Sequence, residues 1–344
     1  MVTLRMSTRG KRVLVTGGAG FIGSHLVEEY LINKAEEVVV LDDFSTGTME
    51  NLDDMRDERL KIVKGSILDF AQLNMIVKKE KIDIIDHLAA ELEVYTGIKD
   101  AERDAKINIL GTLNVLNAAL KNNVEKVLFA SSGAVYGQAK YLPIDEEHPL
   151  EPHWPYGVSK LAAERYVLQY NKLFGLNTTA FRYGIVYGPK EWFGRVLTMF
   201  IKRIFLENKP PVVFGDGSQT RDFVYVKDVV KAHMLAIEKQ ESAGKVFNIG
   251  SGEGVSVKEL ANMLVKASNK GFDILYDNPK EGSASHFQPE RIRLQGELVN
   301  FILDCRKAKE ILGWRPQTDF NEGVTKEIEW ILKFPKRWAG KPRV

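Results

Sequence analysis

The chain has 344 residues, of which 44% are hydrophobic, and a formal net charge of +2. This length and hydrophobic content allow one large α/β domain or two lobes. A net charge so close to zero gives no reason to expect nucleic-acid binding. Cys305 is the single cysteine, so an intramolecular disulfide is excluded, which fits a reducing cytosol.

The first apolar run of the chain covers only 13–15 and is followed by glycines. A signal peptide needs a longer apolar core, and a membrane span needs about 20 apolar residues. We therefore expect a soluble, cytoplasmic protein that does not bind a membrane.

Short β-branched runs alternate with longer amphipathic stretches through the first half of the chain. The expected strands are 12–16, 37–42, 60–65, 82–89, 124–131 and 176–182. The expected helices are 24–34, 70–80, 105–123 and 159–174. Strands separated by helices predict an α/β fold, a doubly wound (Rossmann) parallel sheet with helices on both faces.

After residue 188 the spacing of the patterns becomes irregular, and 270–300 is rich in Gly, Pro and charge, as loops are. We expect a dinucleotide-binding domain over 11–188, completed by segments near 223–250. A smaller, mainly substrate-binding lobe is expected over 189–332, and a basic tail over 333–344.

A glycine-rich loop, VTGGAGFIGSH at 15–25, joins the first expected strand to the first helix. Gly17, Gly20 and Gly23 let the chain turn tightly, approach a pyrophosphate and pack the helix against the strand. Asp42 ends the second strand and can accept hydrogen bonds from both hydroxyls of an adenosine ribose. Because this carboxylate would repel a 2′-phosphate and no arginine follows it directly, the sequence favours NAD over NADP.

The pattern Tyr-x-x-x-Lys occurs five times, at Tyr30/Lys34, Tyr95/Lys99, Tyr136/Lys140, Tyr156/Lys160 and Tyr276/Lys280. Tyr30 is expected at the far end of the first helix, away from the ligand-binding edge of the sheet. No helical pattern carries the lysines that follow Tyr95 and Tyr136, and Tyr276 ends an expected strand. Only Tyr156 opens a long helical pattern, in which its lysine lies one turn on and on the same face.

FASSGAVYG at 129–137 ends the fifth expected strand at the same edge, so Ser131 or Ser132 can face the cofactor. A hydroxyl, the Tyr156 phenol and the Lys160 ammonium together form an acid/base set for hydride transfer. A free tyrosine titrates near pH 10, so catalysis near neutrality requires a pKa about 3 units lower. The ammonium and the positive charge of oxidised nicotinamide can supply that change.

With these motifs in place, the chain resembles the extended short-chain dehydrogenase/reductase family, in its nucleotide-sugar epimerase branch. The resemblance runs from about residue 11 to 332 and includes TGGAGFIGSH, LDDFSTG, DHLAA, NILGTLNVL, SSGAVYG, YGVSK, RYGIVYGP, GDGSQTRDFVYV, FNIGSGE and LDCRKAKEILGW. It implies NAD as cofactor, a UDP-sugar as the favoured substrate, and no metal ion.

The resemblance also implies individual roles. Ser132, Tyr156 and Lys160 would be catalytic: Ser132 binds the 4-hydroxyl, Tyr156 is the acid/base and Lys160 holds the nicotinamide ribose. The substrate would contact Ser132, Tyr156, Arg221, Arg293 and Phe301, with Arg221 on the diphosphate. The cofactor-binding set would be Gly17, Gly20, Phe21, Ile22, Gly23, Asp42, Asp43, Phe44, Ser45, Thr46, Gly47, Ser66, Ile67, Leu88, Ala89, Ala90, Asn108, Ser131, Tyr156, Lys160 and Tyr183.

Members of this family oxidise the sugar at C4, and an epimerase returns the hydride to the other face of the 4-keto sugar. Dehydratases and decarboxylases place acidic residues just after the serine or threonine, whereas this chain has Gly133 and Ala134. A UDP-glucose/UDP-galactose 4-epimerase is therefore the leading expectation. The alternatives are a UDP-glucuronate 4-epimerase, a C4 oxidoreductase of another nucleotide sugar, a 4,6-dehydratase or a non-catalytic NAD-binding regulator.

Some positions depart from the family pattern. Ile185 replaces a substrate-contacting asparagine, Leu294 an arginine and Ser66 an aspartate that often recognises adenine. Phe301 occupies a position that gates N-acetylated sugars in galactose epimerases, which favours non-acetylated hexoses. Helices near 101–120 and 157–172 would, as in the family, form a homodimer through a four-helix bundle.

Overall fold

The structure is a computed structural model that describes residues 7–192 and 194–338. Its centre is a parallel sheet of seven strands in the order β11-β6-β5-β4-β1-β2-β3. The strands are β1 (Arg12–Thr16), β2 (Glu37–Asp42), β3 (Leu60–Lys64), β4 (Ile84–His87), β5 (Lys126–Ser132), β6 (Thr178–Tyr183) and β11 (Lys245–Ile249). The predicted doubly wound α/β fold is confirmed.

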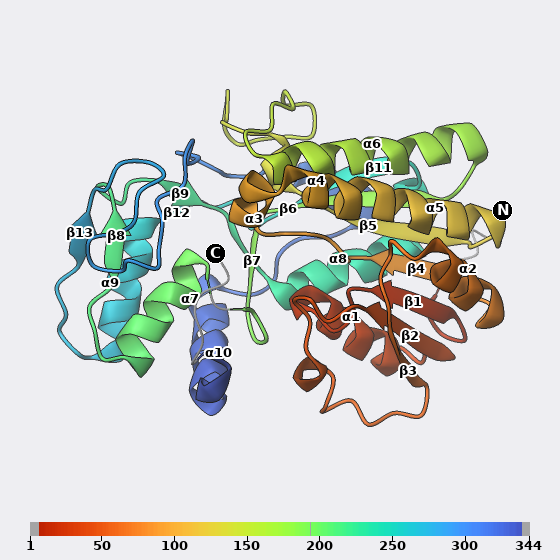
Figure 1. The fold of residues 1–344 in the computed structure, drawn as a ribbon, viewed down its shortest axis with the longest axis horizontal. Helices are drawn as coiled ribbons and strands as arrows, with labels where there is room; N and C mark the ends of the chain where they lie inside the picture. The colour runs from red at the N-terminus through yellow and green to blue at the C-terminus, as the bar shows by residue number, and fades with distance from the viewer. Residues whose placement is uncertain (1–6, 193, 339–344) are drawn as a thin grey trace.

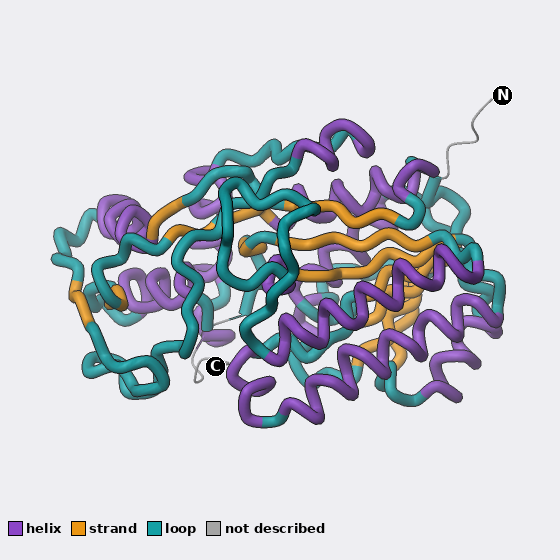
Figure 2. The backbone as a smooth tube through the Cα atoms, turned by 90° about the horizontal axis from the view of Figure 1, so that it is seen from above, coloured by secondary structure: helices purple, strands orange, loops and turns teal. Residues whose placement is uncertain are grey.

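Helices cover both faces of this sheet (Figures 1 and 2). One face carries α2 (Phe70–Lys79), α5 (Thr112–Lys121) and α6 (Pro155–Phe174), and the other carries α1 (Phe21–Ile32) and α8 (Val226–Glu238). The strands are apolar on both sides: Val13 and Val15 pack under α1, whereas Leu14 packs toward the α2 side. Burial on two faces therefore explains the continuous apolar runs of the sequence.

A smaller lobe lies at the other end of the molecule in Figure 1. It contains the paired strands β8 (Val212–Phe214) and β13 (Leu275–Asp277), the pair β9 (Thr220–Arg221) and β12 (Val255–Ser256), and the helices α7 (Val196–Ile201) and α9 (Val257–Ser268). The strands β7 (Ile185–Tyr187) and β10 (Phe223–Tyr225) pair beside α10 (Phe320–Lys333). Of the predicted basic tail, 339–344 lies outside the described residues.

Two predictions from the sequence differ from the structure. The predicted helix at 105–123 divides into the end of α4 (Ala101–Ala105), a π-helix (Lys106–Gly111) and α5. The prediction that no helix carries Tyr95 and Lys99 was wrong, since both lie in α3 (Val94–Lys99). That helix is one and a half turns long and contains Gly97, so its periodicity was too short to detect.

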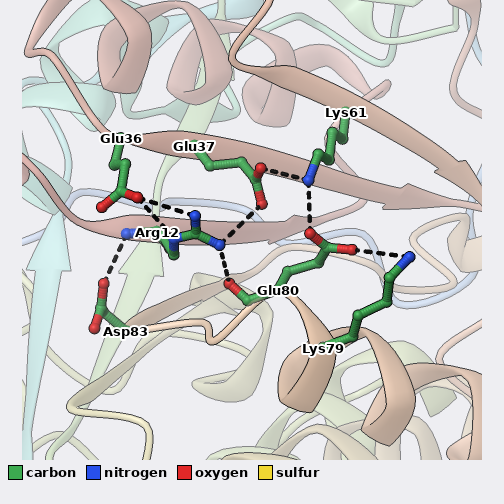
Figure 3. A network of polar contacts seen from close by, with 7 residues as sticks. All are labelled: Arg12, Glu36, Glu37, Lys61, Lys79, Glu80 and Asp83. Carbon is green, nitrogen blue, oxygen red and sulfur yellow. Dashed lines mark hydrogen bonds and ion pairs between the residues drawn. The ribbon is translucent and has the colours of Figure 1, made fainter.

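A charged network ties the amino ends of the strands together, at the edge of the sheet away from the glycine-rich loop (Figure 3). Arg12 on β1 donates to Glu36 at 2.9 Å, and its backbone N–H donates to Asp83 at 2.8 Å. Lys61 on β3 pairs with Glu80 at 2.6 Å. These contacts join β1, β3 and the end of α2, and they are structural.

Among the described residues, no helix is both long and apolar enough to cross a membrane.

Candidate active site

A cavity of about 690 Å³ opens at the carboxyl edge of the sheet, beside the point where the strand order reverses around β1. Open α/β sheets bind ligands at such a switch point, and the volume is typical of a ligand site. The predicted residues that line it are Gly17, Gly20, Phe21, Ile22, Gly23, Asp42, Asp43, Ser45, Thr46, Ser66, Ile67, Leu88, Ala89, Ala90, Ser131, Ser132, Tyr156, Lys160 and Tyr183. The structure thus brings together residues that are up to 166 positions apart in the sequence, from Gly17 to Tyr183.

The glycine-rich loop leaves no room for a side chain at Gly17 or Gly23. Gly17 has a φ of +71°, and a Cβ there would meet the backbone nitrogen of Ala89 at 2.8 Å. A Cβ on Gly23 would meet the carbonyl oxygen of Gly17 at 2.2 Å. Gly20 caps the amino end of α1 without a side chain, which leaves the first N–H groups of that helix open to a pyrophosphate. The loop fits a dinucleotide.

Asp42 holds two loops together at the adenosine end of the cavity. Its carboxylate accepts hydrogen bonds from the backbone N–H groups of Ala19 and Phe44, both at 2.9 Å. Burial raises the pKa of Asp42, and these two hydrogen bonds oppose the rise. Asp43 is exposed beside it. The predicted residues Phe44 and Gly47 support this loop and do not line the cavity; a Cβ on Gly47 would meet the Asp42 carboxylate at 2.8 Å.

The two serines at the end of β5 have different partners. Ser131 is buried and donates a hydrogen bond of 2.6 Å to Glu164. Ser132 accepts from the N–H of Ala134 at 3.1 Å, and it acts to lower the pKa of the Tyr156 phenol. Of the two candidates that the sequence left open, Ser132 is therefore the one that acts on the tyrosine.

Tyr156 and Lys160 lie in the first turns of α6, which begins with Pro155. Burial raises the pKa of Tyr156, and the hydrogen bond from Ser132 and the positive charge of Arg195 oppose the rise. From the sequence we expected the lowering of this pKa to come from Lys160 and the charge of oxidised nicotinamide. Burial lowers the pKa of Lys160 to about 7, and its ammonium lies 4.3 Å from the centre of the Phe129 ring.

Asn108 lies behind the cavity wall, in the π-helix, and is buried. Its side-chain amide donates to Ser159 at 2.9 Å and to the carboxylate of Asp104 at 3.2 Å. Ser159 directly precedes Lys160, so Asn108 fixes the start of α6 from behind. Its predicted place in the cofactor channel is not one of the cavity-lining positions.

The predicted substrate residues of the small lobe do not line this cavity. Arg221, predicted to hold the diphosphate, pairs with Glu297 at 3.0 Å. Arg293 donates to Asn278 at 2.6 Å. Arg291 is more enclosed: its guanidinium stacks 4.0 Å from the Phe214 ring centre, and burial lowers its pKa to about 10.

Phe301 packs directly against the strand end that carries the serines. It is 4% exposed, and a Cβ on Gly133 would meet its Cζ atom at 2.2 Å. The same Cβ would meet the carbonyl oxygen of Tyr183 at 2.9 Å. The position after Ser132 therefore has no room for a side chain.

Several cavity residues carry no motif that the sequence could reveal. They are Glu91, Leu92, Arg103, Lys106, Ile107, Trp192 and Arg195. Arg195 matters most among them because its charge acts on the Tyr156 phenol. Its guanidinium lies 4.1 Å from the Trp192 ring centre and donates to the carbonyl of Val186 at 3.2 Å. Both residues follow β7 in an irregular segment, where periodicity gives no signal.

Comparisons with known proteins agree with this geometry. The family profile described as GDP-mannose 4,6 dehydratase matches residues 14–327. The putative UDP-glucose 4-epimerase of Methanocaldococcus jannaschii is 39% identical over 324 residues, covering 93% of this chain and 98% of that protein. The dTDP-D-glucose 4,6-dehydratase of Mus musculus is 32% identical over 340 residues, covering 95% and 90%.

Solved structures show the same likeness. The UDP-glucose 4-epimerase of Thermotoga maritima with UDP-glucose has a TM-score of 0.84 at 36% identity, covering 94% of this chain and 99% of that one. The UDP-glucuronic acid 4-epimerase of Bacillus cereus, in complex with UDP-glucuronic acid and NAD, has a TM-score of 0.83 at 32% identity, with the same coverage.

Proposed function

Because this chain belongs to the extended short-chain dehydrogenase/reductase family of nucleotide-sugar epimerases and dehydratases, we propose that it is an NAD-dependent nucleotide-sugar 4-epimerase. UDP-glucose and UDP-galactose are the best-supported substrates, since relatives and solved neighbours that span nearly the whole chain carry the name UDP-glucose 4-epimerase. The cavity fits NAD through its side-chain-free glycine loop and its paired acidic residues Asp42 and Asp43.

One observation carries the choice of epimerisation over dehydration. A dehydratase needs an acidic side chain after the serine to act on the oxidised sugar. Here Gly133 occupies that position, and the ring of Phe301 fills the space that such a side chain would need. Ala134 follows, and its N–H is bonded to Ser132. No side chain can be placed at position 133 without rebuilding the packing at the end of β5, and Ala134 carries no group that could transfer a proton.

The chain's own residues would then have separate roles in the reaction. Bound NAD would supply the acceptor for the hydride of C4. Ser132 would orient the 4-hydroxyl, and Tyr156 would remove its proton and later return it. Lys160 would hold the ribose hydroxyls, because its buried ammonium can only donate hydrogen bonds and the hydroxyl oxygens can accept them. Arg221, which pairs with Glu297 in this structure and does not line the cavity, would exchange that partner for the diphosphate.

Arg195 favours a second candidate, a 4-epimerase of UDP-glucuronate. Its guanidinium lines the cavity, acts on the Tyr156 phenol and is 35% exposed. A carboxylate at C6 is two bonds from C4, so a cation in this place could pair with it. The likeness to the Bacillus cereus enzyme supports the same alternative.

A substrate panel tests the proposal. The purified protein is incubated without added cofactor with UDP-glucose, UDP-galactose, UDP-glucuronate or dTDP-glucose, and the products are separated by chromatography. Interconversion of C4 epimers without accumulation of NADH supports the proposal, and the sugar that turns over fastest identifies the substrate. A keto product with one NADH per sugar would indicate an oxidoreductase. A 4-keto-6-deoxy sugar would indicate a dehydratase, and binding of NAD without any turnover would indicate a regulator.

We also propose that two copies pair through α5 and α6, which run side by side along the top of Figure 1. Large apolar side chains are exposed on α6, namely Val158 53%, Tyr166 43% and Leu173 66%, and on the π-helix before α5, namely Leu110 51%. An isologous contact would bury the same patch on both copies as a four-helix bundle. Sedimentation velocity measures the mass directly.

A further inference from the structure

Four buried polar side chains form a chain of hydrogen bonds that leads from the cavity wall into the core. We call Tyr183, His233, Asp86 and Tyr30 the buried relay. The Tyr183 hydroxyl lies 2.5 Å from Nε2 of His233, and Nδ1 of His233 lies 2.8 Å from Oδ2 of Asp86. The Tyr30 hydroxyl donates to the same carboxylate oxygen at 2.8 Å. The four residues come from β6, α8, β4 and α1.

The relay lies in an apolar environment. Asp86, His233 and Tyr30 are each 0% exposed, and Tyr183 is 8% exposed because it lines the cavity. The ring of Phe181 covers His233 with 4.4 Å between the ring centres. A buried polar group is expensive unless it has partners, so four of them in one chain need an explanation beyond packing.

The chemistry of the partners fixes the direction of the hydrogen bonds. A carboxylate only accepts, so Nδ1 of His233 carries the hydrogen that it donates to Asp86. In the neutral imidazole Nε2 then accepts the hydrogen of the Tyr183 hydroxyl. The order carboxylate, imidazole, hydroxyl orients every member toward the cavity wall, as in a catalytic triad.

Asp86 is the acidic member of the relay. His233 and Tyr30 both contact its Oδ2 atom, and among the described residues no lysine or arginine pairs with it and its Oδ1 atom has no hydrogen-bond partner. Burial is the largest cause that raises the pKa of Tyr183, and the charge of Asp86 raises it further. The charge of Asp86 therefore acts on a residue of the cavity wall. A charge held in an apolar interior acts over a longer range than one in water.

We propose that the buried relay makes Asp86, His233 and Tyr30 positioning residues that fix Tyr183 and favour the oxidised, positively charged nicotinamide over the neutral reduced ring. The inference rests on the proposed function, because it requires the cofactor in this cavity. It assigns a role to three residues that touch neither cofactor nor substrate. An epimerase benefits from such a bias, since it must begin each cycle with the cofactor oxidised.

The test measures cofactor affinity and not turnover. The dissociation constants of NAD and NADH are measured by titration calorimetry on cofactor-free protein, for wild type, Asp86→Asn and Tyr183→Phe. The matched control is Asp228→Asn, a buried carboxylate on α8 that accepts from the backbone of Gln317 and Thr318. Circular dichroism and melting temperature report folding of each variant.

We expect Asp86→Asn to weaken NAD relative to NADH by about tenfold, as expected for the loss of one charge at low dielectric. Tyr183→Phe should change the ratio in the same direction and less, and Asp228→Asn should leave it within about twofold of wild type. An unchanged ratio in a folded Asp86→Asn protein would overturn the inference. If Asp86→Asn does not fold, Tyr183→Phe decides by the same criterion. Wild-type protein that binds neither nucleotide would instead contradict the proposed function.

Discussion

Two opposing effects act on the phenol of Tyr156. Burial raises its pKa, whereas the hydrogen bond from Ser132 and the charge of Arg195 lower it. The positive charge of bound nicotinamide would add to the lowering. The residue therefore depends on groups from three segments, the end of β5, the start of α6 and the irregular stretch before α7.

Tyr156→Phe should reduce turnover by about 10²- to 10⁴-fold, because it removes the acid/base and little else. NAD should stay bound, since the glycine loop and the acidic residues are untouched. The measurement combines turnover with the nucleotide released on denaturation. The control is Tyr166→Phe, an exposed tyrosine on the same helix, and unchanged turnover in Tyr156→Phe would remove the assigned role.

Arg195→Met should shift the pH dependence of kcat/KM. In the proposed function the Tyr156 phenolate is the base, so activity in the direction of sugar oxidation should rise with pH through the pKa of Tyr156. Removing the positive charge raises that pKa, and the rising limb should move to higher pH. Arg165→Met, at an exposed position of α6, should not move it. If the rising limb lies at the same pH in wild type and in both variants, the charge of Arg195 does not act on the Tyr156 phenol.

At the scale of elements, the end of β5 is defined by its packing against Phe301 from the small lobe. Gly133 is needed there because the Phe301 ring occupies the place of a Cβ. The contact joins the two ends of the molecule and, in the proposed function, it also excludes the acidic group of a dehydratase. It therefore combines a structural and a specificity role.

Gly133→Ala should destabilise the protein by about 1–3 kcal/mol through overpacking. Phe301→Leu removes the ring atom that the new methyl would meet, at a cost of its own. In the double variant the two losses should partly cancel, with a coupling energy above about 0.5 kcal/mol. Urea unfolding of the four proteins measures this cycle, and simple additivity would contradict the contact.

The same scale shows what sequence patterns can and cannot provide. Strands β1 to β6 follow from short β-branched runs with their turn signals. Five of them are also buried on both faces, whereas β3 at the edge of the sheet is largely exposed. The short α3 helix does not follow from the sequence in this way, because fewer than two turns of helix leave no measurable period. The pattern at 105–123 predicted a helix around Asn108 but not its π-helical geometry. Arg291 stacks on Phe214, whereas Arg293 donates to Asn278, and no sequence pattern indicates how a loop places each of two nearby arginines.

At the scale of the whole molecule, sequence motifs located Tyr156, Lys160 and the glycine loop of the cavity because each motif is contiguous. The buried relay is the opposite case. Its members are at positions 30, 86, 183 and 233, and only the winding of the chain around the sheet brings them together. Arg195 and Trp192 likewise enter the cavity by tertiary placement alone.

Global stability should depend on pH through Lys126, which is 0% exposed and bonded to Ser242 at 2.7 Å and Asn177 at 3.1 Å. Burial lowers its pKa to about 7, against about 10.4 in an unfolded chain. Between these values the unfolded state binds more protons, so stability rises with pH. The free energy of unfolding should rise by roughly 2 kcal/mol between about pH 7 and pH 9 relative to Lys126→Met. Parallel curves for the two proteins would contradict this.

The most direct test of the proposed epimerisation follows the hydrogen at C4. UDP-galactose carrying deuterium at C4 is incubated with the purified protein without added cofactor, and the products are examined by mass spectrometry and NMR. We predict UDP-glucose with the deuterium still at C4, because the bound cofactor takes the hydride and returns it to the same carbon. Deuterium at C6 of a 4-keto-6-deoxy sugar, or in released NADH, would contradict the account.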